Sequence, residues 1–116
     1  MEQVIKRGEI YWVNWNPGRG NEQAGKRPAL IIQNDVGNQF SHNTIIASLT
    51  TAPIKKYPFT VSCTASESGL SKDSIVDLSS IMTISKTRLE NKCGQLSPLR
   101  MKEVDLALKE SLGIVE

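Results

Sequence analysis

The amino-acid sequence predicts a small, mainly β protein: a strongly curved antiparallel barrel closed by one C-terminal helix. Short segments rich in β-branched and aromatic residues recur at spacings of roughly ten to fifteen residues, with turn-forming residues between them. After residue 97 the apolar spacing changes to that of a helix. The chain has 116 residues, 39% of them hydrophobic. This size suits one domain, residues 1–116, with one modest core.

The first predicted strand is EIYWVNW, residues 9–15, which has aromatic residues on both faces. NPGRGNEQAGK follows and is predicted to be a long loop, because it contains three Gly and one Pro. Loops of this length inside a small domain are usually functional or disordered.

Further strands are predicted from short apolar runs. PALIIQ, residues 28–33, is bounded by Pro28 and the turn residues NDVGN, which fits a central strand entered at a proline. NTIIASLT, residues 43–50, is rich in β-branched residues and ends at the loop TTAPIKKYP.

Residues 59–63 (FTVSC) and 74–78 (SIVDL) are two more predicted strands, separated by the turn ASESGLSKD. RLENKCGQL is a further short strand, with Leu89, Asn91 and Cys93 on one face.

The helix is predicted from Ser97 as N-cap, Pro98 at the first helical position and Gly113 as the stop. Its apolar stripe at 3.6-residue spacing consists of Met101, Val104, Leu108 and Leu112.

Composition limits the class of protein. The 14 basic residues are balanced by 12 acidic residues, but residues 1–60 hold seven Lys or Arg against four acids. No apolar run reaches 18 residues and the N-terminus lacks the apolar region of a signal peptide, so we expect a cytosolic protein without a membrane span. Cys63 and Cys93 are then expected to be reduced packing residues. His42, the single histidine, lies in a polar turn that favours a surface role over catalysis.

The stretch GNEQAGKRPALIIQND, residues 20–35, places Glu22, Lys26 and Arg27 directly before a buried strand. A strand end fixes a side chain in space, and fixed charge is what anion recognition and catalysis require. Arg27 is therefore a candidate functional residue.

The same stretch resembles the GxEQxGxRP signature of the MazF/PemK/EndoA toxins, which are sequence-specific mRNA interferases of bacterial toxin–antitoxin systems. IKRGEIYWVNWNP, NTIIASLTT and KDSIVDLSSIMTISKTRL resemble further segments of that family in the same order. The resemblance covers nearly the whole chain.

The resemblance implies an SH3-like barrel of the CcdB/PemK type that works as a homodimer. It also implies an endoribonuclease that cuts single-stranded mRNA without a metal or other cofactor, and a cognate antitoxin protein as partner. Arg27 matches the family's catalytic Arg, and Thr50 matches its catalytic Thr.

These residue types fit attack of a 2′-OH on the neighbouring phosphate. The planar guanidinium of Arg27 matches two phosphate oxygens and can assist the leaving oxygen, but a guanidinium stays protonated in proteins and is therefore a poor base. Thr50 would donate a hydrogen bond to a nonbridging oxygen. Glu22 matches the family's Glu and is a candidate proton acceptor, although a loop Glu is more often a solvated charge.

Two loops offer cations together with groups that contact bases, as single-stranded RNA requires. For Lys55 and Lys56, a solvated turn is as good an interpretation as RNA binding. For Phe59, Trp12 and Trp15 we favour packing roles. The candidate RNA-binding residues are Gly18, Arg19, Asn21 and Gln23 in the first loop, and Lys55, Lys56, Tyr57 and Pro58 in the second.

The sequence departs from the family at Ser80, Met82 and Ser85, where members commonly carry Gln, Arg and Asp. This removes two side chains able to contact RNA, so base preference is expected to differ.

Two other functions remain as alternatives. One is a non-enzymatic toxin on the same barrel that inhibits a protein such as DNA gyrase, but the ending SLGIVE lacks the tryptophan of that branch. The other is an SH3-like peptide-binding module, for which the two Trp and two Tyr residues are too few.

Overall fold

Six strands form one antiparallel sheet in the order β4-β5-β3-β2-β1-β6. The computed structural model describes residues 4–15, 25–51 and 55–115. The elements are β1 (Glu9–Asn14), β2 (Lys26–Ile31), α1 (Asp35–Phe40), β3 (Asn43–Thr50), β4 (Thr60–Cys63), α2 (Ala65–Ser68), β5 (Ser74–Ser85), the 3₁₀ helix η1 (Lys86–Arg88), β6 (Leu89–Gln95) and α3 (Pro98–Leu112).

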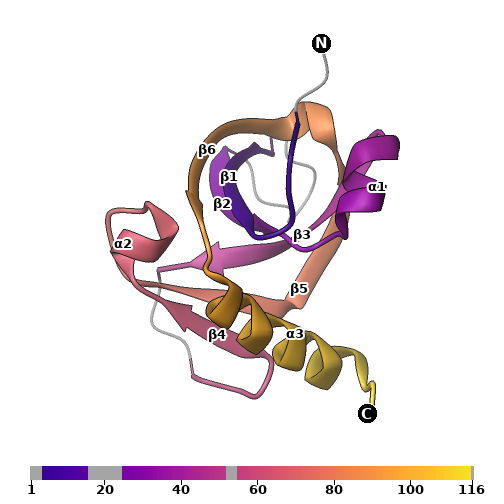
Figure 1. Ribbon diagram of the computed structural model, residues 1–116. Helices are drawn as coiled ribbons and strands as arrows, with labels where there is room; N and C mark the ends of the chain where they lie inside the picture. Colours follow the sequence, from indigo (N-terminus) through magenta and orange to yellow (C-terminus); the bar gives the residue numbers. More distant parts are fainter. Residues whose placement is uncertain (1–3, 16–24, 52–54, 116) are drawn as a thin grey trace.

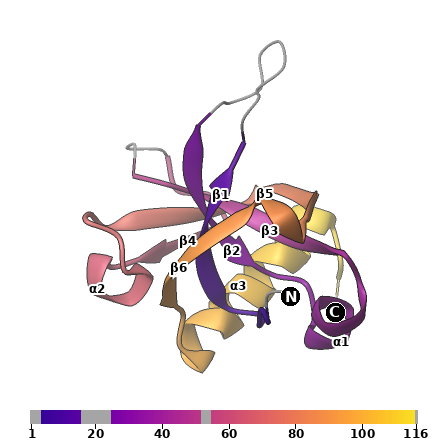
Figure 2. The same cartoon turned by 90° about the horizontal axis from the view of Figure 1, so that it is seen from above.

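The sheet is strongly curved, and α3 lies beside β4 and β5 (Figure 1). Seen from above, β1 and β2 project from the body as a hairpin (Figure 2). None of the helices in the described ranges has the length and apolar character that a membrane span would need.

Two buried clusters use alternate residues of the same strands. Ile10 and Leu30 belong to the cluster that α3 covers with Val104, whereas Tyr11 and Ile31 belong to the second cluster. Because successive side chains of a strand point to opposite faces, the two clusters lie on opposite sides of the sheet. Each fully buried aliphatic side chain contributes about 1.5–3 kcal/mol.

Several predicted elements are confirmed. The strand at residues 43–50 has the predicted bounds, and the first strand ends one residue earlier, at Asn14. In α3 the Ser97 side chain accepts a hydrogen bond from the Arg100 backbone N–H at 3.1 Å, and Gly113 ends the helix with φ 72°. Leu112, expected on the buried stripe, is 56% exposed.

The predicted turn NDVGN was wrong, because the helix α1 begins there. The Asn34 side chain accepts a hydrogen bond from the Gly37 N–H at 2.8 Å and so caps the helix instead of making a turn. Asn38 anchors α1, since its buried amide oxygen accepts a hydrogen bond from the Thr44 hydroxyl at 2.8 Å.

The predicted turn ASESGLSKD also contains a helix, α2. Thr64 and Glu67 form a capping box, in which each side chain accepts a hydrogen bond from the other residue's backbone N–H. Ser and Gly favour turns and helix ends alike, so composition did not separate the two structures.

β2 and β5 also differ from their predicted bounds. β2 begins at Lys26, before Pro28, because Arg27 pairs with Val13 and Lys26 with Asn14. β5 has 12 residues where five were predicted. Its pairing with β3 shifts between Ala47, opposite Ile81, and Ser48, opposite Asp77, so the strand continues past an irregularity.

The predicted common face of Leu89, Asn91 and Cys93 was wrong. Leu89 packs in the second cluster and Cys93 against the first, while Asn91 is exposed. Register shifts between β1 and β6 interrupt the alternation of side chains along β6.

Cys63 is buried and Cys93 half-buried, and both are free. Burial raises the pKa of the Cys63 thiol to about 11, as suits a packing residue.

Candidate functional site

The register of the sheet brings Arg27 and Thr50 to neighbouring positions. Ala29 on β2 is opposite Ser48 on β3. Continuing this antiparallel register by two residues places Arg27 opposite Thr50. Arg27 is exposed and Thr50 is half-buried at the end of β3.

Arg27 and Thr50 line the same cavity, which has a volume of about 200 Å³. Strands β2, β3 and β5 and the residue after β1 contribute its walls. The lining residues are Trp15, Arg27, Pro28, Ser48, Leu49, Thr50, Asp77 and Ser80.

This arrangement suits a phosphate. Arg27 presents a planar fork of N–H donors and Thr50 a hydroxyl, and the sheet holds the backbone of both residues. Within residues 4–15, 25–51 and 55–115, no side chain forms an ion pair or hydrogen bond with Arg27. The guanidinium can therefore meet a ligand without first breaking such a contact.

Asp77 and Ser48 were not found by sequence reasoning. They are opposite each other on β5 and β3. The signal at Asp77 was a charged residue inside a strand, between the buried Val76 and Leu78. Its position beside Thr50 depends on long-range pairing, which the sequence pattern does not show.

Trp15 and Ser80 also line this cavity. Trp15 packs against the second cluster as well, so the predicted packing role and a place at the site coexist. Of the departures from the family pattern, Ser80 lies at the site, Met82 is 47% exposed, and Ser85 caps η1 by accepting a hydrogen bond from the Thr87 N–H.

The candidates of the first loop, Gly18, Arg19, Asn21, Glu22 and Gln23, lie outside the described residues. Their predicted roles stay predictions.

The second loop carries an exposed cation and stacked rings. The Lys55 ammonium lies 5.9 Å from the centroid of the Tyr57 ring, which stacks on Phe59 at 5.0 Å with an angle of 7° between the rings. Phe59 is half-buried and packs against the first cluster, in agreement with the favoured packing role. Lys56 is exposed.

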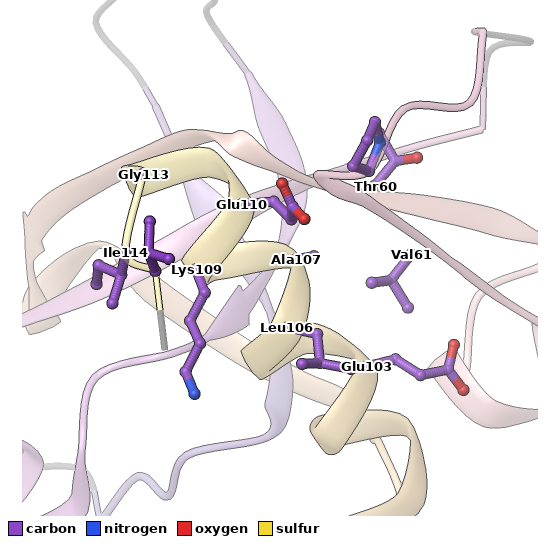
Figure 3. Close-up of a pocket in the computed structure, with 11 residues that line it drawn as sticks. Thr60, Val61, Glu103, Leu106, Ala107, Lys109, Glu110, Gly113 and Ile114 are labelled. Atoms are coloured by element: carbon purple, nitrogen blue, oxygen red, sulfur yellow. The ribbon is translucent and has the colours of Figure 1, made fainter.

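A larger cavity, of about 610 Å³, lies between α3 and β4 (Figure 3). Among its lining residues, Val61 and Ala107 are buried, while Leu106 is 64% exposed. Pro58 lines this cavity and not the one that holds Arg27. Among the described residues, no cluster of three or more His, Cys, Asp or Glu side chains could hold a metal ion.

Comparison with known proteins agrees with this fold. The model of the PemK-like, MazF-like toxin of type II toxin–antitoxin systems matches residues 6–112, so the chain belongs to this toxin family. The Endoribonuclease EndoA of Bacillus subtilis (strain 168) is 41% identical over 114 residues, which cover 97% of this chain and 98% of that protein.

Two solved structures have the same fold. An endoribonuclease in complex with its cognate antitoxin, from a Mycobacterial species, is 25% identical with a TM-score of 0.81, covering 97% of this chain and 98% of that one. A MazE–MazF structure (Form-II) from Deinococcus radiodurans is 27% identical with a TM-score of 0.78, covering 98% and 100%. These likenesses confirm the predicted family and the mainly β fold with a C-terminal helix.

Proposed function

We propose that residues 1–116 act as one domain, a sequence-specific endoribonuclease that cuts single-stranded mRNA without a metal ion. The protein is then the toxin of a type II toxin–antitoxin pair, acting in the cytosol where its substrate is found. The observation that carries this proposal is the cavity that brings Arg27 and Thr50 together on adjacent strands.

The proposed reaction is attack of the 2′-oxygen on the adjacent phosphorus, which gives a 2′,3′-cyclic phosphate and a 5′-hydroxyl. Arg27 binds two oxygens of the five-coordinate phosphorus and donates a proton toward the departing 5′-oxygen. Thr50 donates a hydrogen bond to a nonbridging oxygen. Groups fixed on strands supply such stabilisation without reorganising during the reaction.

The reaction also needs a proton acceptor. Glu22 is the candidate that the family resemblance supplies. A carboxylate within hydrogen-bond reach of the 2′-OH is the requirement that any candidate must meet.

RNA binding is assigned to both loops. In the second loop, Lys55 and Lys56 would contact phosphates, and the exposed Tyr57 ring, stacked on Phe59, offers a flat surface to a base. Pro58 would contact RNA from the edge of this loop. Arg19, Asn21 and Gln23 have the corresponding role in the first loop.

Mixed RNA incubated with the purified protein in EDTA tests the proposal. We expect cleavage at a short common sequence, mapped from the 5′ ends of the products, and none with Arg27→Ala. Loss of wild-type cleavage in EDTA would contradict metal independence.

A homodimer is the proposed assembly, and the cavity beside α3 is its proposed interface. A domain this small leaves apolar surface to cover. Of the ten exposed large hydrophobic side chains in the described ranges, five lie on or just after α3: Leu99, Leu106, Leu112, Ile114 and Val115.

The proposed partner is an antitoxin whose acidic, partly disordered segment occupies the RNA site. The cations Arg27, Lys55 and Lys56 attract carboxylates as well as phosphates, and a disordered peptide can wrap a long surface as it folds. RNA and antitoxin should therefore exclude each other.

Titrating antitoxin peptide into a complex of Arg27→Ala protein and RNA tests this exclusion. RNA binding should weaken more steeply with salt than peptide binding does, because phosphates release counterions. Unchanged RNA affinity at saturating peptide would show that inhibition has another cause.

A further inference from the structure

We propose that Asp77 is the catalytic residue that accepts the proton of the attacking 2′-OH. This assignment rests on the proposed endoribonuclease function and puts Asp77 in place of Glu22 as its base. In the described part of the chain, Asp77 is the one carboxylate that lines the cavity of Arg27 and Thr50.

The sheet places these three side chains in two neighbouring rows. Ser48 on β3 is opposite Asp77 on β5, and Thr50 is opposite Ile75. Residues opposite each other, and residues two apart on one strand, share a face of the sheet. Asp77 therefore lies on the same face as Thr50, one strand further from β2.

Arg27 approaches the cavity from the other side, on β2. No ion pair within 4.0 Å joins Arg27 and Asp77, although the structure describes both residues. Arg27, Thr50 and Asp77 line one cavity, and Thr50 is on β3, the strand between those that carry Arg27 and Asp77. In-line attack requires this order, because the nucleophile and the leaving oxygen are on opposite sides of the phosphorus.

The Asp77 carboxylate is held by one of its oxygens. Oδ1 accepts hydrogen bonds from the Ser79 N–H at 3.0 Å and from the Ser79 hydroxyl at 2.6 Å. Oδ2 has no hydrogen-bond partner among the described residues. A base oriented by a third group, with one oxygen available, is the arrangement that general-base catalysis uses.

The proton balance is complete. Asp77 Oδ2 takes the proton of the 2′-OH as the bond between the 2′-oxygen and phosphorus forms. The bond between phosphorus and the 5′-oxygen breaks, and this oxygen takes a proton from Arg27. Asp77 then releases its proton to water and Arg27 regains one, so both groups return to their starting states.

A negative side chain beside a phosphate weakens RNA binding by repulsion. Replacing Asp77 by Asn removes this charge and keeps the shape, including an oxygen that can accept from Ser79. The base assignment therefore predicts opposite effects on two quantities: RNA binding is retained or strengthened, while cleavage is slowed.

The experiment compares wild type, Asp77→Asn, Glu22→Gln and, as a matched control outside the cavity, Asp105→Asn. Single-turnover cleavage is measured on a defined RNA. Binding is measured on the same RNA with a 2′-deoxy nucleotide at the cut. We expect Asp77→Asn to cut about 10²- to 10⁴-fold more slowly with unchanged or tighter binding, and Asp105→Asn to match wild type.

A substrate with sulfur in place of the bridging 5′-oxygen gives a second measurement, because a thiolate leaves without being protonated. It should partly restore cleavage by Arg27→Ala but not by Asp77→Asn. Equal restoration of both variants would overturn the assignment.

Cleavage by Asp77→Asn within about threefold of wild type, or a parallel loss of RNA binding, would also overturn it. So would a loss confined to Glu22→Gln, which would assign the base to Glu22. These outcomes leave the proposed function intact if wild type still cuts. Wild-type protein that cuts no RNA would overturn both.

Discussion

Arg27 has a role that depends on its shape as well as its charge. A guanidinium binds two phosphate oxygens through a planar fork, whereas the ammonium of Lys is a point charge on a flexible stem. The adjacent Lys26 has a different role, since its ammonium pairs with the Glu90 carboxylate at 2.8 Å. Two neighbouring cations thus allow a test of shape at constant charge.

We predict that Arg27→Lys lowers kcat/KM by at least about 100-fold, as for the loss of a transition-state contact. Lys26→Arg, the matched control, should cut at close to the wild-type rate. Steady-state cleavage of a fluorescent RNA measures both. If Arg27→Lys retained near wild-type activity, the two-pronged contact would be wrong.

At the scale of elements, α2 and β6 approach each other closely at Gly69. A Cβ added there would lie 1.5 Å from the Cys93 carbonyl oxygen, and Gly69 has φ 78°. Gly113 shares the left-handed conformation, with φ 72°, but nothing lies within 4 Å of its added Cβ. Substitutions at Gly69 and Gly113 therefore separate the free-energy cost of the clash from the free-energy cost of the backbone conformation.

Gly113→Ala should lower the free energy of unfolding by about 1 kcal/mol, the cost of the left-handed conformation. Gly69→Ala should lower it by a further ~1–3 kcal/mol, because the backbone must move. Urea unfolding measures both, and equal losses would contradict the close approach of α2 to β6.

Glu67 links α2 to α3. Its carboxylate accepts hydrogen bonds from the Arg100 guanidinium at 3.0 and 3.1 Å, and this contact, followed by the Thr64 N–H, lowers its pKa. A carboxyl group whose pKa is lower in the folded state stabilises the fold above its unfolded pKa. This stability is lost as the pH falls through the folded pKa.

Glu67→Gln should therefore destabilise the protein at pH 7 and have a smaller effect near pH 3. Thermal melting across that range measures the difference from wild type. A difference that grows on acidification would contradict the stated sign.

Local signals account for what the sequence predicted about the elements. The cap Ser97, Pro98 and the stop Gly113 lie within or beside α3, so its bounds were predictable. The length of β5 was not predictable, because the strand continues past an irregularity in its pairing with β3, between Ala47 and Ser48. Arg27 was a candidate from its place before a buried strand, and the family resemblance supplied its catalytic role and Thr50. Asp77 became visible only when the register was known.

At the scale of the whole molecule, the proposed homodimer makes the surface of α3 an interface. Leu106 is 64% exposed at the edge of the cavity between α3 and β4, whereas Val36, 70% exposed, lies on α1. A buried charge without a partner is costly, so a carboxylate at Leu106 would disfavour the dimer.

Leu106→Glu should shift the mass measured by light scattering at micromolar concentration from dimer to monomer, while Val36→Glu remains a dimer. An active wild-type monomer would refute the proposed assembly. A dimer that persists in Leu106→Glu would place its interface on another surface.

We propose above that the protein cleaves RNA at the cavity of Arg27 and Thr50, through the substrate's own 2′-hydroxyl. The most direct test uses two RNAs that differ only in a 2′-deoxy nucleotide on the 5′ side of the cut, in EDTA, with mass spectrometry of the products. The unmodified RNA should give a 2′,3′-cyclic phosphate and a 5′-hydroxyl, and the deoxy RNA should bind but stay intact. Cleavage of the deoxy RNA at the same position would contradict attack by the 2′-hydroxyl.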